Sequence, residues 1–591
     1  MKYKRLLAML LAVVMTLGTF GSAVPVAVSA VGPERASNLA EDYTTPWSTD
    51  VLPDLNAPAD QNVDDVKFTH NEYTGLTVDG IHNEDVFGVN REEASVFSTT
   101  GILYDSVEKA IAGARDYDRE GSAYFQKLTG PGQADWSLTV LKNAAEADTA
   151  SYRDFYKPGY ETFSESAAQS RDHNYGIWKD GLELPASWEY YGFDYSIYTN
   201  TNVPWQAEDD RSTESCPEAP VNFNPVGLYR KTFTVDDGLK SSGGRIYLNL
   251  QGVESAYYVY INGKEVGYSE DSFDPHSFDV TDYLVEGENL LAVKVHRFSD
   301  GTWFELQDMF QDGGIFRDIY LYTAPLVHID DYFVTTDLDE DYVNATMNLE
   351  VAVRNSADTV ASGYKVDVRL YDEDGDMFFN GMTLEIPDIP AATAKTGNEN
   401  IISHNVGVAS GSAIVLAPEL WTAETPNLYY LVLSVYSADG VYMGSMAQQH
   451  GFREIEFTRT EVDENGHAVT PTEDYQQVTI NGRRLLIKGA NRHETDPVYG
   501  KYIHPEVMEL DVAIMKQNNI NAVSTAHYTN DDYFYYLCNK YGLYVNAEPN
   551  LECHQLQSAG AGDKMALCKE MILDRGVAAL EQLKNCTSVV I

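Results

Sequence analysis

Strand and helix patterns alternate from residue 478 to the end of the chain, and this alternation restricts the fold more than any other feature. "QVTINGRRLLIKGANRHE" predicts a strand, "HPEVMELDVAIMKQNN" a helix with Val507, Leu510 and Ile514 at helical spacing, and "INAVSTAH" a second strand. The alternation continues through "DDYFYYLCNKYG", "LYVNAEPNLE" and "DRGVAALEQLKN", and "SVVI" begins a fourth strand. Such alternation predicts a parallel sheet of the (β/α)8 TIM-barrel type, incomplete over residues 456–591.

Two β-rich domains are expected before the barrel. Residues 65–325 alternate short strand patterns with turn signals, as at Asn262-Gly263, and predict an antiparallel jelly-roll β-sandwich. Residues 326–455 carry a second set of strands at the spacing of an immunoglobulin-like β-sandwich, which we interpret as a spacer. The predicted fold class is therefore multidomain β plus α/β.

The N-terminus has the features of a bacterial-type signal peptide. A basic start is followed by an apolar stretch and by the small-residue site Val28-Ser29-Ala30, which predicts a signal peptide over residues 1–30 and a secreted or cell-surface protein. Gly18 and Pro25 interrupt the apolar run below the ~20 residues that span a bilayer, so a retained anchor is disfavoured. Residues 31–64 are predicted to be a linker.

The charge of the chain restricts its partners. Asp and Glu number 90 against 41 Lys and Arg, and a net charge of −49 repels a phosphate backbone, so we expect no nucleic-acid partner. Forty tyrosines suit β-rich sandwiches and surfaces that stack against sugars. The five cysteines show no CxxC spacing, so neither a zinc site nor a disulfide framework is indicated.

Several long motifs resemble those of one enzyme family, in the same order along the chain. They include "VFGVNRE", "NPVGLYRKTF", "RFSDGTWFELQDMFQDGGIFRDIYLY", "INGRRLLIKGANRHE", "MKQNNINAV" and "YGLYVNAEPNLECH". These stretches look like the β-galactosidases of glycoside hydrolase family 2, and the resemblance covers roughly residues 82–591. It implies a retaining exo-glycosidase that releases terminal β-galactose from oligosaccharides and that can form homo-oligomers.

A retaining glycosidase needs two carboxylates about 5–5.5 Å apart. In the family the acid/base glutamate lies in a "WSxGNE"-like stretch that directly follows the strand resembling "SVVI", and the nucleophile lies on a later strand. That stretch would begin one residue past Ile591, so we expect both catalytic glutamates to lie beyond this chain, which by itself would be an inactive fragment.

The resemblance also assigns the remaining site residues. His493 and His527 resemble the histidines that bind galactosyl hydroxyls at the ends of the first two barrel strands. Glu552 and His554 resemble the pair that binds Mg²⁺ together with the acid/base glutamate. Asp300 resembles an aspartate of the jelly roll that reaches the barrel mouth, contacts the sugar and binds Na⁺. A turn residue at Asp300 and structural histidines are the ordinary alternatives.

Some positions leave the function open. Trp303 and Phe304 are expected either to line the sugar site or to belong to the core. Departures from the family pattern put galactose specificity in question, and they fall at Ser524, Ala526, Thr529, Ala547, Gln555 and Cys216. The alternatives are a non-catalytic carbohydrate-binding protein and a related family 2 enzyme that acts on β-glucuronides or β-mannosides.

Overall fold

The computed structural model describes residues 77–78, 81–82, 101–163, 172–200, 202–206, 219–392, 405–457, 478–554 and 562–591. The predicted signal peptide and linker lie outside these ranges. Within them, no helix combines the length and the apolar character that a membrane crossing requires. The first described strands are the short pair β1 (Thr77–Val78) and β2 (Ile81–His82).

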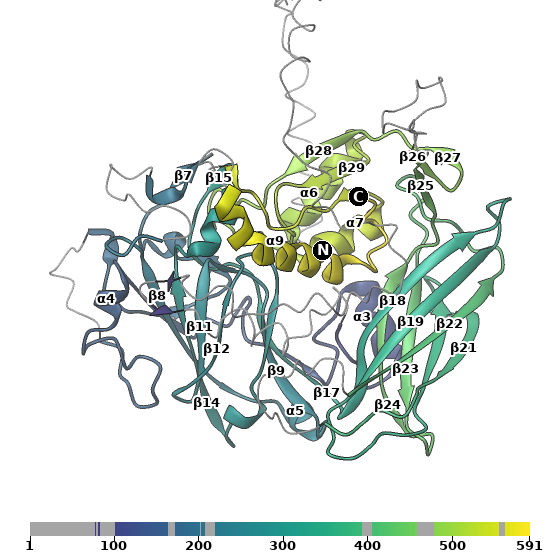
Figure 1. Cartoon of the computed structure of the whole chain (residues 1–591), viewed down its shortest axis with the longest axis horizontal. Coiled ribbons are helices and arrows are strands. Elements are labelled where there is room, and N and C mark those ends of the chain that lie inside the picture. Colours follow the sequence, from purple (N-terminus) through teal and green to yellow (C-terminus); the bar gives the residue numbers. More distant parts are fainter. Residues whose placement is uncertain are drawn as a thin grey trace, which may run out of the picture. The chain divides into compact units, whose positions relative to one another are not determined.

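The first domain is a sandwich of two antiparallel sheets, which confirms the jelly-roll prediction (Figure 1). The larger sheet has the order β12-β11-β14-β8-β4-β5, with β4 Trp136–Leu141, β5 Lys179–Leu182, β8 Val226–Thr234, β11 Ala256–Ile261, β12 Lys264–Glu270 and β14 Glu288–His296. The smaller has the order β13-β9-β17-β3, with β3 Phe125–Lys127, β9 Arg245–Leu250, β13 His276–Asp279 and β17 Ile319–Ala324. Their facing apolar side chains, such as Trp136, Tyr229 and Leu248, form the core.

The turn predicted at Asn262-Gly263 joins β11 to β12. Asn262 has φ 52° and Gly263 has φ 82°, the left-handed region that a tight two-residue hairpin turn requires. Short elements complete the domain: α4 Ala144–Ala147, α5 Asp237–Ser241, β6 Ala186–Ser187, β7 Tyr198–Thr199, β10 Val253–Glu254, β15 Met309–Phe310, β16 Gly314–Ile315 and the 3-10 helices η4 Asp172–Asn174, η5 Trp188–Tyr191, η6 Pro204–Gln206, η7 Thr281–Tyr283 and η8 Asp300–Phe304.

The second domain is the expected immunoglobulin-like sandwich. One sheet has the order β18-β19-β22, with β18 Val327–Leu338, β19 Ala345–Asn355 and β22 Val406–Val415. The other has the order β21-β20-β23-β24, with β20 Lys365–Tyr371, β21 Met377–Glu385, β23 Tyr429–Tyr436 and β24 Tyr442–His450. Strand β19 shows why the sequence folds this way, because alternate residues such as Met347, Leu349 and Val351 are buried between the sheets.

An early segment of the chain packs against this second domain. Helix α3 (Val107–Asp116) begins at Ser106, whose side chain accepts a hydrogen bond from the backbone N–H of Lys109. Tyr104 pairs with Ser445 of β24 through two backbone hydrogen bonds of 2.8 and 3.0 Å. The segment thus covers a face of the β23–β24 sheet that is more than 300 residues away in the sequence.

His450, at the end of β24, gives the chain a component of acid sensitivity. Burial, and after it the positive charge of Arg453, lowers the pKa of His450 to about 4. The unfolded chain takes up this proton near the ordinary histidine pKa of about 6.5, whereas the folded chain does so only near 4. Stability is therefore lost as the pH falls through this window.

We expect wild type to lose about 2 kcal/mol more stability than His450→Gln between about pH 7.5 and about pH 5, as follows from the two pKa values. Urea unfolding at the two pH values measures this difference. Equal losses of stability in both proteins would show that folding does not lower the pKa of His450.

The third part of the chain contains three parallel strands in the order β28-β29-β30, with β28 Gly489–Arg492, β29 Ala522–Thr525 and β30 Tyr544–Asn546. Helices α6 (Pro505–Gln517), α7 (Asp532–Tyr541) and α9 (Gly562–Leu583) alternate with them (Figure 1). Val589 forms a parallel bridge with Val545 of β30. This arrangement confirms the partial α/β prediction.

One detail of this region adds to the prediction and another differs from it. The buried face of α6 carries Met508, Val512 and Met515, whereas Leu510 and Ile514 are each 48% exposed. Val507 is partly buried and packs against the same core, so only one of the three residues whose spacing predicted the helix faces the core. "QVTINGRRLLIKGANRHE", by contrast, is not the one strand that was predicted. It contains β26 (Val478–Ile480), which pairs with β25 (Ile455–Phe457), then β27 (Arg483–Arg484), which pairs with β26, and then β28.

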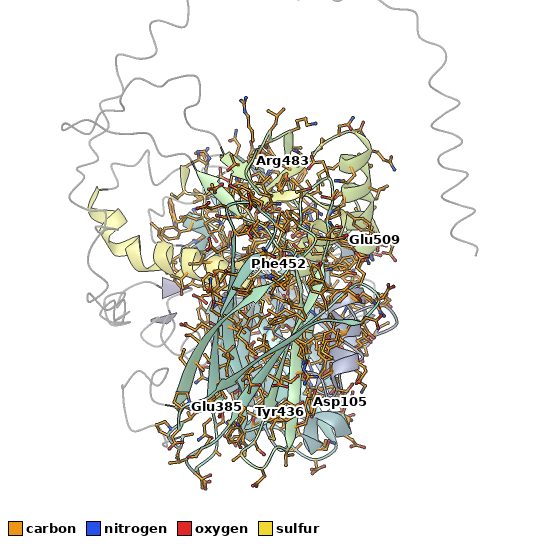
Figure 2. All side chains as sticks on the ribbon, turned by 90° about the vertical axis from the view of Figure 1, so that its right-hand side faces the viewer. Asp105, Glu385, Tyr436, Phe452, Arg483 and Glu509 are labelled. Carbon is orange, nitrogen blue, oxygen red and sulfur yellow. The ribbon has the colours of Figure 1, made fainter. Side chains whose placement is uncertain are left out.

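Side chains are closely packed where the second domain meets the parallel strands. Phe452, labelled in Figure 2, is fully buried. Trp421 is also fully buried, and its indole N–H donates to the backbone oxygen of Asn539 at 2.9 Å. Asn539 Oδ1 accepts a hydrogen bond from the backbone N–H of Ser588 at 2.8 Å. The second domain therefore supports α7 directly.

Candidate active site

Five ionisable side chains meet at the carboxyl ends of the parallel strands, and we call them the strand-end cluster: His493, His527, Glu548, Glu552 and His554. His493 follows β28, His527 follows β29, and the other three follow β30. The carboxyl ends of parallel strands lie at one edge of the sheet, where this fold carries its chemistry. The cluster thus places four of the five predicted site residues together.

Contacts link the members of the strand-end cluster in a row. Glu548 Oε2 lies 2.6 Å from His527 Nδ1, and His527 Nε2 lies 3.9 Å from Glu552 Oε2. Glu552 Oε1 and His554 Nε2 form a hydrogen bond. The rings of His493 and His527 meet edge to face with centroids 5.7 Å apart. Imidazoles and carboxylates in such a row can exchange hydrogen bonds with the hydroxyl groups of a sugar.

Electrostatics favour the neutral form of His493. Burial, and after it the charge of His527, lowers its pKa, while Asp308 and Glu548 act in the opposite direction. Its Nδ1 is buried and has no hydrogen-bond partner among the described residues. A neutral imidazole has one donor and one acceptor nitrogen, which suits it to bind a hydroxyl group.

The jelly-roll segment that contains Phe304 and Leu306 lies along the end of β30. The backbone N–H of Glu552 donates to the oxygen of Phe304 at 2.6 Å, and that of Leu306 donates to the oxygen of Glu552 at 2.9 Å. Gln307 Nε2 donates to Asn550 Oδ1 at 2.9 Å. These bonds fix the strand-end cluster against the first domain.

Asp300 lies on the same jelly-roll segment but in a different environment. It is fully buried, and the carboxyl of Glu270 and the guanidinium of Arg575 are among the groups that interact with its carboxyl. Burial raises the pKa of Asp300. Burial also raises the pKa of Glu270 well above its usual range; the charge of Asp300 raises it further, and the charge of Arg575 lowers it. The two carboxyls can therefore share one proton.

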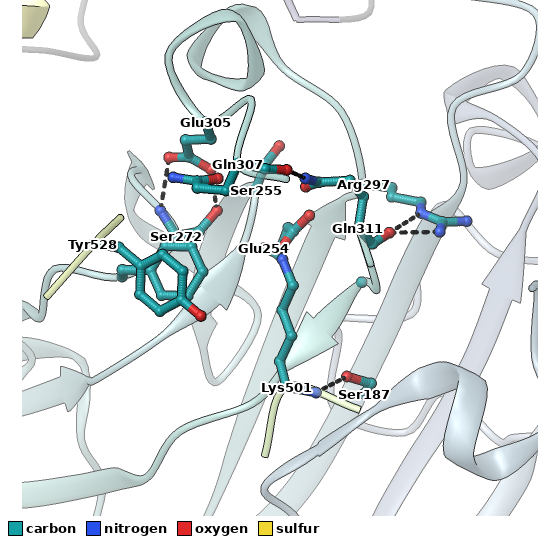
Figure 3. Close-up of polar contacts among 12 residues, drawn as sticks. Ser187, Glu254, Ser255, Ser272, Arg297, Glu305, Gln307, Gln311, Lys501 and Tyr528 are labelled. Atoms are coloured by element: carbon teal, nitrogen blue, oxygen red, sulfur yellow. Dashed lines mark hydrogen bonds and ion pairs between the residues drawn. The ribbon is translucent and has the colours of Figure 1, made fainter. Parts of the chain in front are cut away.

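Arg575, from α9, balances further acids beside this pair. Its Nη1 donates to Glu305 Oε1 at 2.7 Å and to the oxygen of Asn550 at 3.0 Å, and it lies 3.5 Å from Asp271 Oδ1. Glu305 also accepts hydrogen bonds from the backbone N–H and the hydroxyl of Ser272, as Figure 3 shows. This buried acid group was not predicted, because its members are far apart in sequence.

A second buried arginine joins the jelly roll to the strand-end region. Arg317 donates to Glu494 Oε2 at 2.7 Å and to the backbone oxygens of Thr529 and Phe273, each at 2.6 Å. The Phe273 ring stacks on Tyr528 with centroids 3.8 Å apart. Since Glu494 and Tyr528 directly follow the two site histidines, these contacts position both histidines.

A further contact between the first domain and the barrel segment involves Lys501. It forms a buried ion pair with Glu254, and its backbone N–H donates to Ser187 Oγ at 3.0 Å (Figure 3). Burial lowers the pKa of Lys501 to about 7. The hydrogen bond from the Lys501 backbone N–H to Ser187 fixes the loop after β28 whether or not the Lys501 amine is charged.

The remaining positions named in the sequence analysis lie in the core, at a domain contact or outside the described residues. Trp303 and Phe304 belong to a buried apolar cluster, so they are core residues. Ala547 packs against the core beneath β30, and Thr529 Oγ1 donates to Asp274 Oδ1 at 2.5 Å. Gln555 and Cys216 lie outside the described residues. Glu548 was not predicted as a site residue, although its place directly after β30 could have identified it.

The donor set for a divalent metal is partly present. Glu552 and His554 contact each other, and Glu552 Oε2 is buried with no hydrogen-bond partner in the described part of the chain. Carboxylate oxygen suits Mg²⁺, which commonly keeps several waters and takes few protein ligands. The described ranges contain no group of three or more His, Cys, Asp or Glu side chains arranged to hold a metal, and Mg²⁺ binding stays a prediction.

Comparison with known proteins places this architecture in a family. Domain models of glycosyl hydrolases family 2 match residues 168–325 (sugar binding domain), 327–453 and 472–591 (TIM barrel domain). The chain belongs to this family.

Curated relatives extend the comparison. The chain is 37% identical over 519 residues to a β-galactosidase of Priestia megaterium, covering 86% of this chain and 44% of that protein. It is 33% identical over 527 residues to a β-galactosidase of Clostridium acetobutylicum, covering 87% and 50%. The chain thus spans about half the length of these relatives.

Solved structures support the fold alone. A Bacteroides uniformis β-glucuronidase 2 structure matches with a TM-score of 0.52 at 21% identity, covering 79% of this chain and 46% of that one. A family 2 member from Bacteroides cellulosilyticus matches with a TM-score of 0.55 at 19% identity, covering 79% and 51%.

Proposed function

We propose that this chain is part of a retaining β-galactosidase-like glycoside hydrolase that acts on terminal β-galactosides. The strand-end cluster carries this proposal, because two histidines and two glutamates from three parallel strands meet where the family places its sugar site. The identity of 33–37% to β-galactosidases favours galactosides over the glucuronides of the structurally similar enzymes, which are about 20% identical to this chain.

Within this proposal, each residue has a role that its contacts allow. His493 and His527 bind sugar hydroxyls, and the jelly-roll segment around Leu306 closes one side of the site. Glu552 and His554 would hold Mg²⁺, which supplies a positive charge beside the sugar when bound. Buried Asp300 would hold Na⁺. The N-terminal sequence supports export of the protein from the cell.

We expect the purified chain to bind methyl β-D-galactopyranoside, and His527→Ala to weaken this binding about 5- to 150-fold, the range for losing a hydrogen bond worth about 1–3 kcal/mol. Ligand-observed NMR titration measures the affinity. His173→Asn is the matched control, because His173 is an exposed jelly-roll histidine whose φ of 50° asparagine tolerates.

Two outcomes of this titration would contradict the proposal. Tighter binding of methyl β-D-glucuronide than of the galactoside would favour the glucuronidase alternative. Unchanged galactoside affinity in His527→Ala would place sugar binding away from the strand-end cluster, as expected for a carbohydrate-binding protein that uses its sandwich domains.

A further inference from the structure

Ser524, one of the departures from the family pattern, contacts two polar side chains, one at the end of the neighbouring strand and one just after it. It is on β29, directly beside Asn546 of the parallel strand β30. Asn546 Nδ2 lies 2.9 Å from the Ser524 hydroxyl, and that hydroxyl lies 2.5 Å from Glu548 Oε1. A position that departs from the family pattern therefore holds a neutral side chain with two polar contacts.

The direction of these hydrogen bonds follows from the groups involved. A hydroxyl has one hydrogen, and the Asn546 amide donates to its oxygen, so the hydroxyl hydrogen is left for Glu548 Oε1. The backbone N–H of Glu548 also donates to Thr525 Oγ1 at 3.0 Å. Both the backbone and one carboxylate oxygen of Glu548 are thus held by β29.

The second carboxylate oxygen sets the orientation of His527. Glu548 Oε2 lies 2.6 Å from His527 Nδ1, and an ionised carboxylate only accepts hydrogen bonds, so the ring proton belongs on Nδ1. Nε2 then faces Glu552 Oε2 across 3.9 Å, a separation too long for a direct hydrogen bond. In the neutral ring this Nε2 is an acceptor.

We propose that Ser524 is a positioning residue that acts through Glu548 to hold His527 in the tautomer with its proton on Nδ1. Nε2 is then left free to accept a hydrogen bond from a ligand hydroxyl. Only this last step rests on the proposed function. Ala547 complements the arrangement, since an acidic side chain beside Glu548 would add a negative charge for which Ser524 offers no cation.

The test is ¹⁵N NMR of the full chain labelled with [¹⁵N]histidine, in the absence of sugar. We would record it at about pH 8.5, roughly two units above the ordinary histidine pKa. His527→Gln assigns the signals of His527. In wild type we expect a protonated-type shift for Nδ1 and an unprotonated-type shift for Nε2. Ser524→Ala should lower the ratio of the two tautomers roughly fivefold, the effect of about 1 kcal/mol, which is part of the value of one hydrogen bond to a charged group. Ser524→Thr should restore the ratio because it keeps the hydroxyl.

Glu548→Gln provides a second variant should Ser524→Ala fold poorly, and it is expected to abolish the preference for Nδ1. Thermal unfolding of each variant separates positioning from stability, because a purely structural role would lower the Tm without moving the tautomer ratio. A proton on Nε2 in wild type, or the wild-type ratio in both Ser524→Ala and Glu548→Gln, would overturn the proposal. Since no sugar is present, this outcome does not depend on whether the chain binds β-galactosides.

Discussion

Replacing Arg575 with methionine is expected to destabilise the chain by about 3–5 kcal/mol, the cost of removing one partner from a buried ion pair. The guanidinium is fully buried and bonds Glu305, and its charge opposes the raised pKa values of Glu270, Asp300 and Glu305. Without it, these buried carboxyls lose the positive charge that Arg575 supplies from α9. Urea unfolding at neutral pH measures the loss.

The pH dependence of the Arg575→Met loss distinguishes this explanation from lost packing. Carboxyls whose folded pKa is raised above the unfolded value favour folding at low pH, and this contribution is lost as the pH rises through the folded pKa. The difference between variant and wild type should therefore be smaller at acidic pH than at neutral pH. Arg575→Lys retains the charge and should lose less. A pH-independent loss in Arg575→Met would indicate packing alone.

The second large effect is expected for Arg317→Met, about 3 kcal/mol, the lower end of the range for removing one partner of a buried ion pair. Glu494 loses its 2.7 Å contact with Arg317 and keeps the longer one, 3.3 Å, with Arg492. Arg317 also holds the backbone oxygens of Phe273 and Thr529. Its loss should therefore free the segments that carry the site histidines and weaken galactoside binding as well as stability. Arg369→Met is the matched control, since its ion pair with Asp367 on the second domain is partly exposed and such pairs contribute about 0–1 kcal/mol.

Unfolding and sugar titration of these two variants test the assignment together. A loss for Arg317→Met no larger than that for Arg369→Met would mean that the contact between the jelly roll and the barrel segment does not stabilise the chain. Full galactoside affinity in a destabilised Arg317→Met protein would separate stability from the orientation of the histidines.

Local patterns predicted the architecture well because strand alternation, turn chemistry and helix periodicity are short-range signals. The Asn262-Gly263 hairpin and the alternation of strands and helices after residue 478 are examples. Which face of α6 is buried did not follow from helical spacing alone, because apolar residues such as Leu510 and Met508 occur on both sides of the helix and only Met508 packs into the core.

The candidate site could be predicted only where its residues lie at the end of a strand that the sequence pattern shows. His493, His527, Glu552 and His554 were found because each follows a predicted strand and matches a family motif. The partners of Arg317 and Arg575 were not found, since Glu494 is 177 residues from Arg317 and Glu305 is 270 residues from Arg575. Pairings over such separations depend on how whole domains dock.

The contact between the jelly-roll segment and the end of β30 has a consequence for how this enzyme family can diversify. Glu552 is held by the backbone atoms of Phe304 and Leu306, and such bonds persist with any side chains at those two positions except proline at 306, which has no backbone N–H. Point substitutions along this segment can therefore accumulate without displacing Glu552. Exchange of a whole barrel between relatives is more demanding, because a chimera must also bring together the matching arginine and glutamate at positions 317 and 494.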